Sequence, residues 1–174
     1  MENEQLDIAS DRLNAWNQEL PSAMVAQFEA KILIHQGKKT EAIEALKKAA
    51  FLYGNEALWN SLLWTALFTD HPIEELWNES KDRFDPKTVS AATLHTLACV
   101  KAQTGAISDA IEDLESVVNQ QGNVIKSADW LVIGMIAEQC DLFDSARKAY
   151  ERVELQKEVD SAYELAQLRL KMLP

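Results

Sequence analysis

The chain has 174 residues, of which 47% are hydrophobic and 26% charged, so it is long enough for one folded domain with a core. Its 28 acidic and 17 basic residues leave a net charge of −11, which disfavours nucleic acid as a partner because the phosphates would be repelled. No run of apolar residues approaches the ~18–20 residues of a membrane span, so we expect no insertion into a membrane.

The first predicted element is a helix over residues 4–19. It carries apolar residues at helical spacing, among them Leu6, Leu13 and Trp16, and it ends before Pro21. The segment begins with acidic and polar residues, which is not the pattern of a signal peptide.

The next pattern is a glycine followed five positions later by an alanine, and it occurs twice. Gly37 and Ala42 form the first such pair, and Gly105 and Ala110 form the second, with the two alanines 68 residues apart (110 − 42), or twice 34. Ala146 follows 36 residues after the second alanine (146 − 110). A period of 34–36 residues in a helix-rich chain predicts stacked helical hairpins.

Another small residue precedes each alanine of this period by 12 positions. These residues are Ala30, Ala98 and Gly134. Two helices joined by a short turn must cross closely, and small side chains on both sides allow separations at the short end of the 8–10 Å range. The spacing therefore predicts a buried crossing of small residues in each of three hairpins.

The middle segment, residues 57–86, departs from this rule. One period after Ala42 lies Leu76, and 12 positions before Leu76 lies Trp64, so two bulky residues replace the small pair. We expect a degenerate repeat whose hairpin is splayed or rotated. The alternative is a pair of helices outside the repeat geometry.

The last predicted element is a helix over residues 159–173. Asp160 and Ser161 form a suitable N-cap, and apolar residues recur at helical intervals after them. In total the sequence predicts about ten helices and no convincing strand, which is the all-α class.

The repeats resemble the tetratricopeptide repeat (TPR). Its opening pattern, Trp-x2-Leu-Gly, is matched well by Trp130, Ile133 and Gly134, and residues 37–49 (GKKTEAIEALKKA) fit its second helix. The resemblance covers roughly residues 23–155 and implies a right-handed α-solenoid of antiparallel hairpins.

Solenoids need atypical end units that cover their terminal apolar faces. The resemblance therefore implies an N-terminal capping helix (1–20), about four repeats within 21–156 (approximately 23–56, 57–90 as the degenerate repeat, 91–126 and 127–158) and a C-terminal capping helix (159–174).

In this family the first helix of each hairpin lines the concave surface, where peptides bind. Placed on that pattern, the predicted groove residues are Met24, Gln27, Lys31, Ile34, His35, Leu58, Ser61, Thr65, Phe68, His95, Cys99, Gln103, Leu131, Met135 and Glu138. Only Lys31 and Glu138 in this set are charged, so we expect a mildly apolar groove that suits an apolar or amphipathic peptide. The alternative is that a terminal helix folds back and fills the groove.

Some relatives hold a C-terminal carboxylate with a clamp of cationic side chains from successive first helices. Here Lys31 is the only cation on the predicted inner face, so this clamp is not expected. The acidic surface is interpreted as a solvated face, with a preference for basic partners as the alternative.

The sequence offers little for catalysis. None of the three histidines, His35, His71 and His95, has a partner at a metal-ligand spacing, and no phosphate-binding glycine loop occurs. His95 and Cys99 are four residues apart on one predicted helix, but a nucleophile also needs an oxyanion site and an orienting group. We expect no enzyme, no metal and no cofactor.

The expected function is a non-catalytic protein-interaction module that binds a peptide or helix of another protein, with self-association as a further possibility. Two alternatives stay open: a specialised acidic chaperone similar to those of type III secretion, and the repeat region of a larger multidomain protein. Cys99 and Cys140, interpreted as core thiols, indicate a reducing compartment and hence the cytoplasm.

Overall fold

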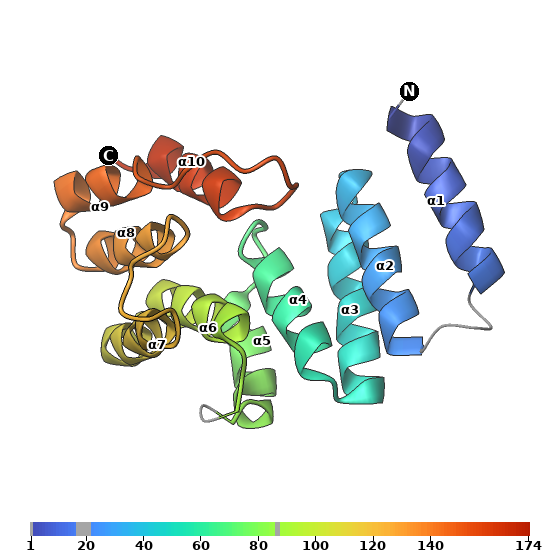
Figure 1. Ribbon diagram of the computed structural model, residues 1–174, viewed down its shortest axis with the longest axis horizontal. Helices are drawn as coiled ribbons and strands as arrows, with labels where there is room; N and C mark the ends of the chain where they lie inside the picture. The colour runs from blue at the N-terminus through green and yellow to red at the C-terminus, as the bar shows by residue number, and fades with distance from the viewer. Residues whose placement is uncertain (1, 17–21, 86–87) are drawn as a thin grey trace. The chain divides into compact units, whose positions relative to one another are not determined.

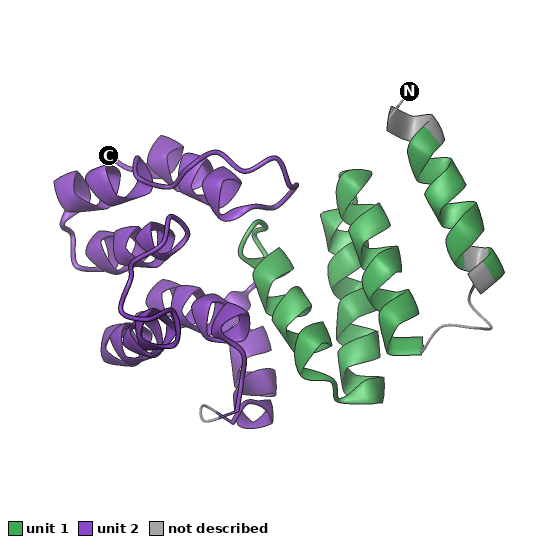
Figure 2. Cartoon of the chain, viewed as in Figure 1, with its two compact units in different colours: residues 1–71 green, residues 72–174 purple. Residues whose placement is uncertain are grey.

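The structure is a computed structural model that describes residues 2–16, 22–85 and 88–174. Within these residues it contains ten α-helices, one short 3₁₀-helix and no strand, which confirms the predicted all-α class. The chain divides into two compact units, residues 1–71 and 72–174 (Figure 2).

Unit 1 contains four helices: α1 (Glu2–Trp16), α2 (Ser22–His35), α3 (Lys39–Tyr53) and α4 (Glu56–Ala66). The helices α2 and α3 form an antiparallel hairpin, and α4 packs on α3 (Figure 1). The first helix, α1, packs antiparallel on the side of α2 that faces away from α3. The predicted N-terminal helix over 4–19 is thus observed over 2–16, and residues 17–19 lie outside the described residues.

Small residues and turn residues explain the first hairpin. Ala30 and Ala42 are both buried, as the spacing predicted, so α2 and α3 approach closely. Gly37 has a φ of +75° in the turn between them, a conformation that favours glycine. The next turn uses Gly54 as a left-handed C-cap and Asn55 as an N-cap, whose side chain accepts a hydrogen bond from the Ala57 amide at 2.7 Å.

Unit 2 contains six α-helices and the 3₁₀-helix: α5 (Ile73–Ser80), η1 (Lys81–Arg83), α6 (Ala91–Gln103), α7 (Ile107–Gln120), α8 (Asp129–Gln139), α9 (Phe143–Tyr150) and α10 (Ala162–Met172). The pairs α6–α7 and α8–α9 are hairpins, and α10 packs against α8 and α9 (Figure 1). The predicted second repeat spans the boundary of the units, because α4 belongs to unit 1 and α5 to unit 2.

The small-residue crossings of unit 2 are also buried. Ala98 and Ala110 have no exposed surface, and neither has Ala146. A Cβ atom at Gly134 would lie only 2.3 Å from Cε1 of Tyr150, so any larger residue here would require the Tyr150 ring to move. The prediction of close crossings is therefore confirmed for these two hairpins.

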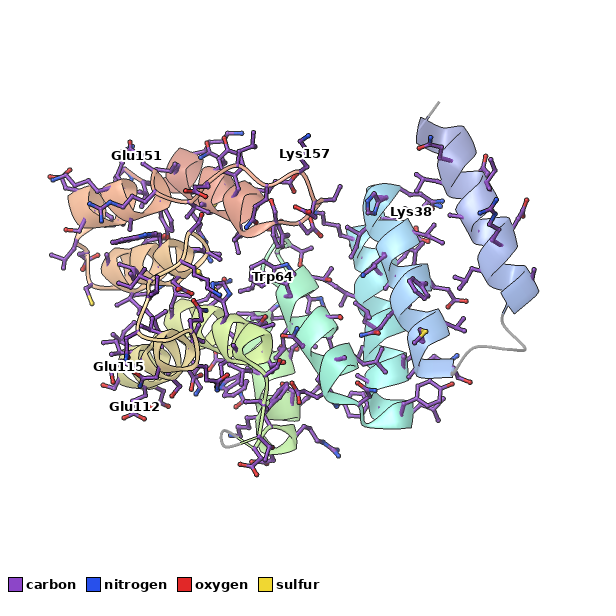
Figure 3. The ribbon with its side chains drawn as sticks, viewed as in Figure 1. Lys38, Trp64, Glu112, Glu115, Glu151 and Lys157 are labelled. Atoms are coloured by element: carbon purple, nitrogen blue, oxygen red, sulfur yellow. The ribbon has the colours of Figure 1, made fainter. Side chains whose placement is uncertain are left out.

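An amphipathic pattern orients α7. Asp113 is buried and its Oδ2 lies 2.7 Å from Nζ of Lys101 on α6, while Glu112 and Glu115 point away from α6 into solvent (Figure 3). Lys101 also lies 5.8 Å from the ring centroid of Trp77 on α5, a cation–π contact. One lysine thus joins three helices of unit 2.

The last helix begins where the sequence predicted. The side chain of Ser161 accepts a hydrogen bond from the Glu164 amide at 3.3 Å, which is N-cap geometry. Leu165 and Ala166 of α10 have no exposed surface, so this helix covers apolar surface of its own unit.

Candidate protein-binding site

The fifteen predicted groove residues are divided between the units. Nine belong to unit 1, on α2, α4 and the turn after α4, and six belong to unit 2, on α6 and α8. Each set is described within its own unit.

In unit 2 the structure places the apolar members of the set in the core. Leu131 is 0% exposed and Met135 is 1% exposed, and Cys99 is also fully buried. The reason is packing: α8 contacts α6, α7, α9 and α10, so its apolar side chains have no open side. The expectation that these three side chains are open to a partner is therefore corrected.

The polar members in unit 2 are bound by the C-terminal helix. Arg169 of α10 hydrogen-bonds Oε1 of Gln103 and lies 3.3 Å from Oε1 of Glu138. The Tyr150 hydroxyl donates to Oε2 of Glu138 at 2.6 Å. This network joins α6, α8, α9 and α10, so within unit 2 a terminal helix binds two of the polar side chains that the sequence assigned to a groove, Gln103 and Glu138.

The candidate His95–Cys99 pair is part of the same core. Nε2 of His95 lies 2.9 Å from the carbonyl oxygen of Ala128, and burial lowers the pKa of the imidazole below 6.5. Burial raises the pKa of the Cys99 thiol well above its usual range. Because the thiolate is the nucleophilic form, this environment disfavours nucleophilic chemistry at Cys99.

The predicted residues of unit 1 are more open. On α2, Met24 is 42% exposed, Lys31 and His35 are also exposed, and Gln27 and Ile34 are half-buried. One face of α2 packs against α1.

The members on and after α4 differ from those on α2. Leu58 and Thr65 are buried, which corrects the expectation for these two residues, while Ser61 and Phe68 are half-buried. The Phe68 ring has Nζ of Lys39 4.7 Å from its centroid and Trp64 at 5.7 Å in an edge-to-face arrangement. Phe68 is thus already held by contacts within unit 1.

A pocket of about 440 Å³ lies between α1 and α2. Its lining comes from both helices: Gln5, Leu6, Ile8, Ala9, Arg12, Leu13, Phe28, Lys31, Ile32 and His35. Phe28 is 41% exposed and Ile8 is 49% exposed, so apolar surface on both walls reaches solvent. Leu13 is buried at 6% exposure and anchors α1.

Sequence reasoning found only two residues of this pocket, Lys31 and His35. It missed Phe28 and Ile32, although both lie on the same face of α2 at helical spacing from the two found. It also interpreted α1 as a cap and therefore expected the apolar side chains of α1 to be covered. The pocket exists because α1 packs incompletely on α2, and no local sequence pattern predicts incomplete packing.

The charges of the pocket differ from those of the chain. Arg12, Lys31 and His35 line it, whereas the described lining residues include no carboxylate. Asp7 and Asp11 of α1 lie outside the lining. In a chain of net charge −11, the pocket is thus apolar with a local excess of cationic side chains.

A second hollow, of about 380 Å³, lies between α2 and α3 and includes Glu29, Lys48 and Tyr53 in its lining. It carries both signs of charge, so its charge selects no class of ligand. The pocket between α1 and α2 is the better candidate for a site because its apolar walls and its charge both select a ligand class.

Taken together, the described residues define an all-helical protein of two compact units, with an open apolar pocket in the first. None of the described helices combines the length and the hydropathy that a membrane span requires. Comparison with protein-family models, with curated proteins and with solved structures found no match to this chain.

Proposed function

We propose that this chain is a non-catalytic protein-interaction module, a right-handed α-solenoid of tetratricopeptide-like hairpins, that binds a helix or peptide of another protein between α1 and α2. The observation that carries the proposal is the apolar pocket of about 440 Å³ with Phe28 and Ile8 exposed on opposite walls. Partly exposed apolar surface gathered in a groove is typical of protein-binding sites.

Two further observations support the proposal. The hairpins α2–α3, α6–α7 and α8–α9 each carry the buried pair of small residues that the repeat spacing predicts. Both cysteines are free thiols, although only Cys99 is buried, so the interpretation of Cys140 as a core thiol is corrected. Their lack of a disulfide is compatible with the reducing cytoplasm in which we place the protein.

The proposal is tested by site-specific photo-crosslinking in cells with the full chain. A benzoyl-phenylalanine at position 28 should yield one dominant crosslinked protein. The same residue at position 51 is the matched control, because Phe51 is an exposed aromatic residue (51%) that does not line the pocket.

The crosslinked protein is then purified and titrated against the unmodified chain. Phe28→Ala should weaken binding by about 30-fold, since truncating an apolar anchor costs about 2 kcal/mol. Phe51→Ala should leave the affinity unchanged. Equal crosslinking from both positions, or an unchanged affinity in Phe28→Ala, contradicts the proposal.

A further inference from the structure

Building on the proposed function, we infer that the segment bound between α1 and α2 is an amphipathic helix whose apolar stripe is flanked by acidic residues. The inference names the chemistry of the partner from the dimensions and the charge of the pocket.

The dimensions favour the side chains of a helix. The lining spans eight residues' rise along α1, from Gln5 to Leu13, and seven along α2, from Phe28 to His35. At 1.5 Å per residue these walls are about 10–12 Å long, which is two helical turns. Two turns of a helix about 10–12 Å wide have a larger volume than this pocket of about 440 Å³. The pocket can therefore receive the apolar side chains of two turns, while the partner's backbone stays outside.

The apolar character of both walls matches such a stripe. Leu6, Ala9 and Leu13 lie at helical spacing on α1, and Phe28 and Ile32 lie one turn apart on α2. Residues of a partner helix at positions i, i+3, i+4 and i+7 would meet this surface over the same two turns.

The charge selects acidic flanks. Arg12 on one wall and Lys31 on the other are both exposed, so each can pair with a carboxylate at the edge of the stripe. The other charges of the chain oppose an acidic partner at long range. Asp7, Asp11 and Glu29 are near the pocket on the same two helices but do not line it, whereas Arg12 and Lys31 do. Charges farther than about 8 Å are screened at physiological ionic strength, so the expected preference depends on these two cations at the pocket wall.

The test uses the full chain and three synthetic helical peptides with one leucine stripe in common. The residues that flank the stripe are glutamate in the first peptide, glutamine in the second and lysine in the third. Affinities are measured at low and high salt, with the helicity of each peptide matched by circular dichroism.

We expect the glutamate peptide to bind about five-fold more tightly than the glutamine peptide at low salt, as two exposed ion pairs would give. The lysine peptide should bind most weakly. In 0.5 M salt the three affinities should converge, since screening removes the exposed ion pairs.

Charge reversal in the pocket provides the matched variant. The double substitution Arg12→Glu and Lys31→Glu should invert the preference, so that the lysine peptide binds most tightly. Both residues are exposed, so the fold should be retained. Lys148→Glu is the control, because Lys148 is an exposed lysine of α9 outside the pocket, and it should leave the order of the peptides unchanged.

Equal binding of the three peptides, an order unchanged in the double variant, or no binding by any peptide overturns the inference. The photo-crosslink at position 28 tests the proposed function separately. A specific crosslink together with charge-independent peptide binding would retain the proposed function and reject the acidic partner. Failure of the crosslink and of all three peptides would reject both.

Discussion

The two cysteines differ in their access to solvent. Cys140 is exposed and Cys99 is fully buried, with the pKa of the Cys99 thiol raised by burial. A thiol reagent at pH 8 should therefore modify one thiol per native chain and two in denaturant, because the thiolate is the reactive form. Cys140→Ser should leave no fast-reacting thiol, and fast modification of Cys99 in that variant would contradict the structure.

Gly134 of α8 lies directly against the Tyr150 ring of α9. Gly134→Ala places a Cβ 2.3 Å from the Tyr150 ring, so we expect a loss of about 1–3 kcal/mol in unfolding free energy from overpacking. Urea unfolding measures this loss. In a Tyr150→Leu background the same change should cost clearly less, and an equal cost in both backgrounds would show that the ring is not the obstacle.

Asp113 gives a pH dependence whose sign follows from its surroundings. Burial raises the pKa of this carboxyl above 3.8, and the hydrogen bond and charge of Lys101 offset only part of that rise. The folded state therefore holds the proton more tightly than the unfolded state. The resulting stabilisation is complete below pH 3.8 and is lost as the pH rises through the folded pKa.

Asp113→Asn removes this titration. The unfolding free energy of the variant relative to the original chain should rise as the pH increases from about 4 toward 7, measured by urea unfolding at each pH. Glu115→Gln, a change at an exposed carboxyl of the same helix that is not among the causes of the raised pKa of Asp113, is the control. A relative stability that falls over this range would contradict the assigned direction.

At the scale of the elements, Arg169 of α10 adds polar links to α6 and α8 beside the apolar packing of this helix. Arg169→Met would leave Glu138 and Gln103 without their cationic partner, and the Arg169 and Glu138 side chains are only 12% and 20% exposed. We expect a loss of about 2–3 kcal/mol, somewhat below the ~3–5 kcal/mol of a fully buried pair. Lys171→Met, on the same helix but exposed, should change the unfolding midpoint little, and equal effects would contradict the proposed role of the network.

The two terminal helices differ in how they cover their neighbours. In α10, Leu165 and Ala166 are fully buried, whereas the pocket-lining residues of α1 include buried Leu13 and exposed Ile8. Both helices were expected to act as caps. The packing of α10 covers apolar surface of its own unit, whereas α1 leaves an open pocket beside α2, and this difference is why we propose the binding site in unit 1. The role of either helix as a solenoid cap stays a prediction.

At the scale of the whole molecule, the net charge of −11 opposes compaction through self-repulsion. Raising the salt concentration from 0.05 to 0.5 M should therefore raise the melting temperature, because screening weakens this repulsion. At this chain length about 1 kcal/mol corresponds to about 2–4 °C. Thermal unfolding followed by circular dichroism measures the change, and a melting temperature that falls with added NaCl would show that attractive ion pairs dominate.

The sequence by itself determined the helices and their hairpins. The Ser161 cap was predictable because a helix and its cap depend on residues within about one turn of each other. The buried pairs Ala30–Ala42 and Ala98–Ala110 were predictable because a short turn brings two consecutive helices together at a fixed spacing of 12 residues. The wider separation expected between the two helices of the second repeat stays a prediction, since these helices belong to different units.

Only the tertiary structure decided which apolar faces are covered. The local sequence pattern around Leu131 and Met135 is the one expected of residues that line an open groove. The packing of four helices around α8 nevertheless buries both side chains. Arg169 meets Gln103 across 66 residues of chain, and no periodicity predicts such a contact. The pocket between α1 and α2 arises for the same physical reason: coverage depends on how segments distant in sequence pack, whereas periodicity records only which side of each helix is apolar.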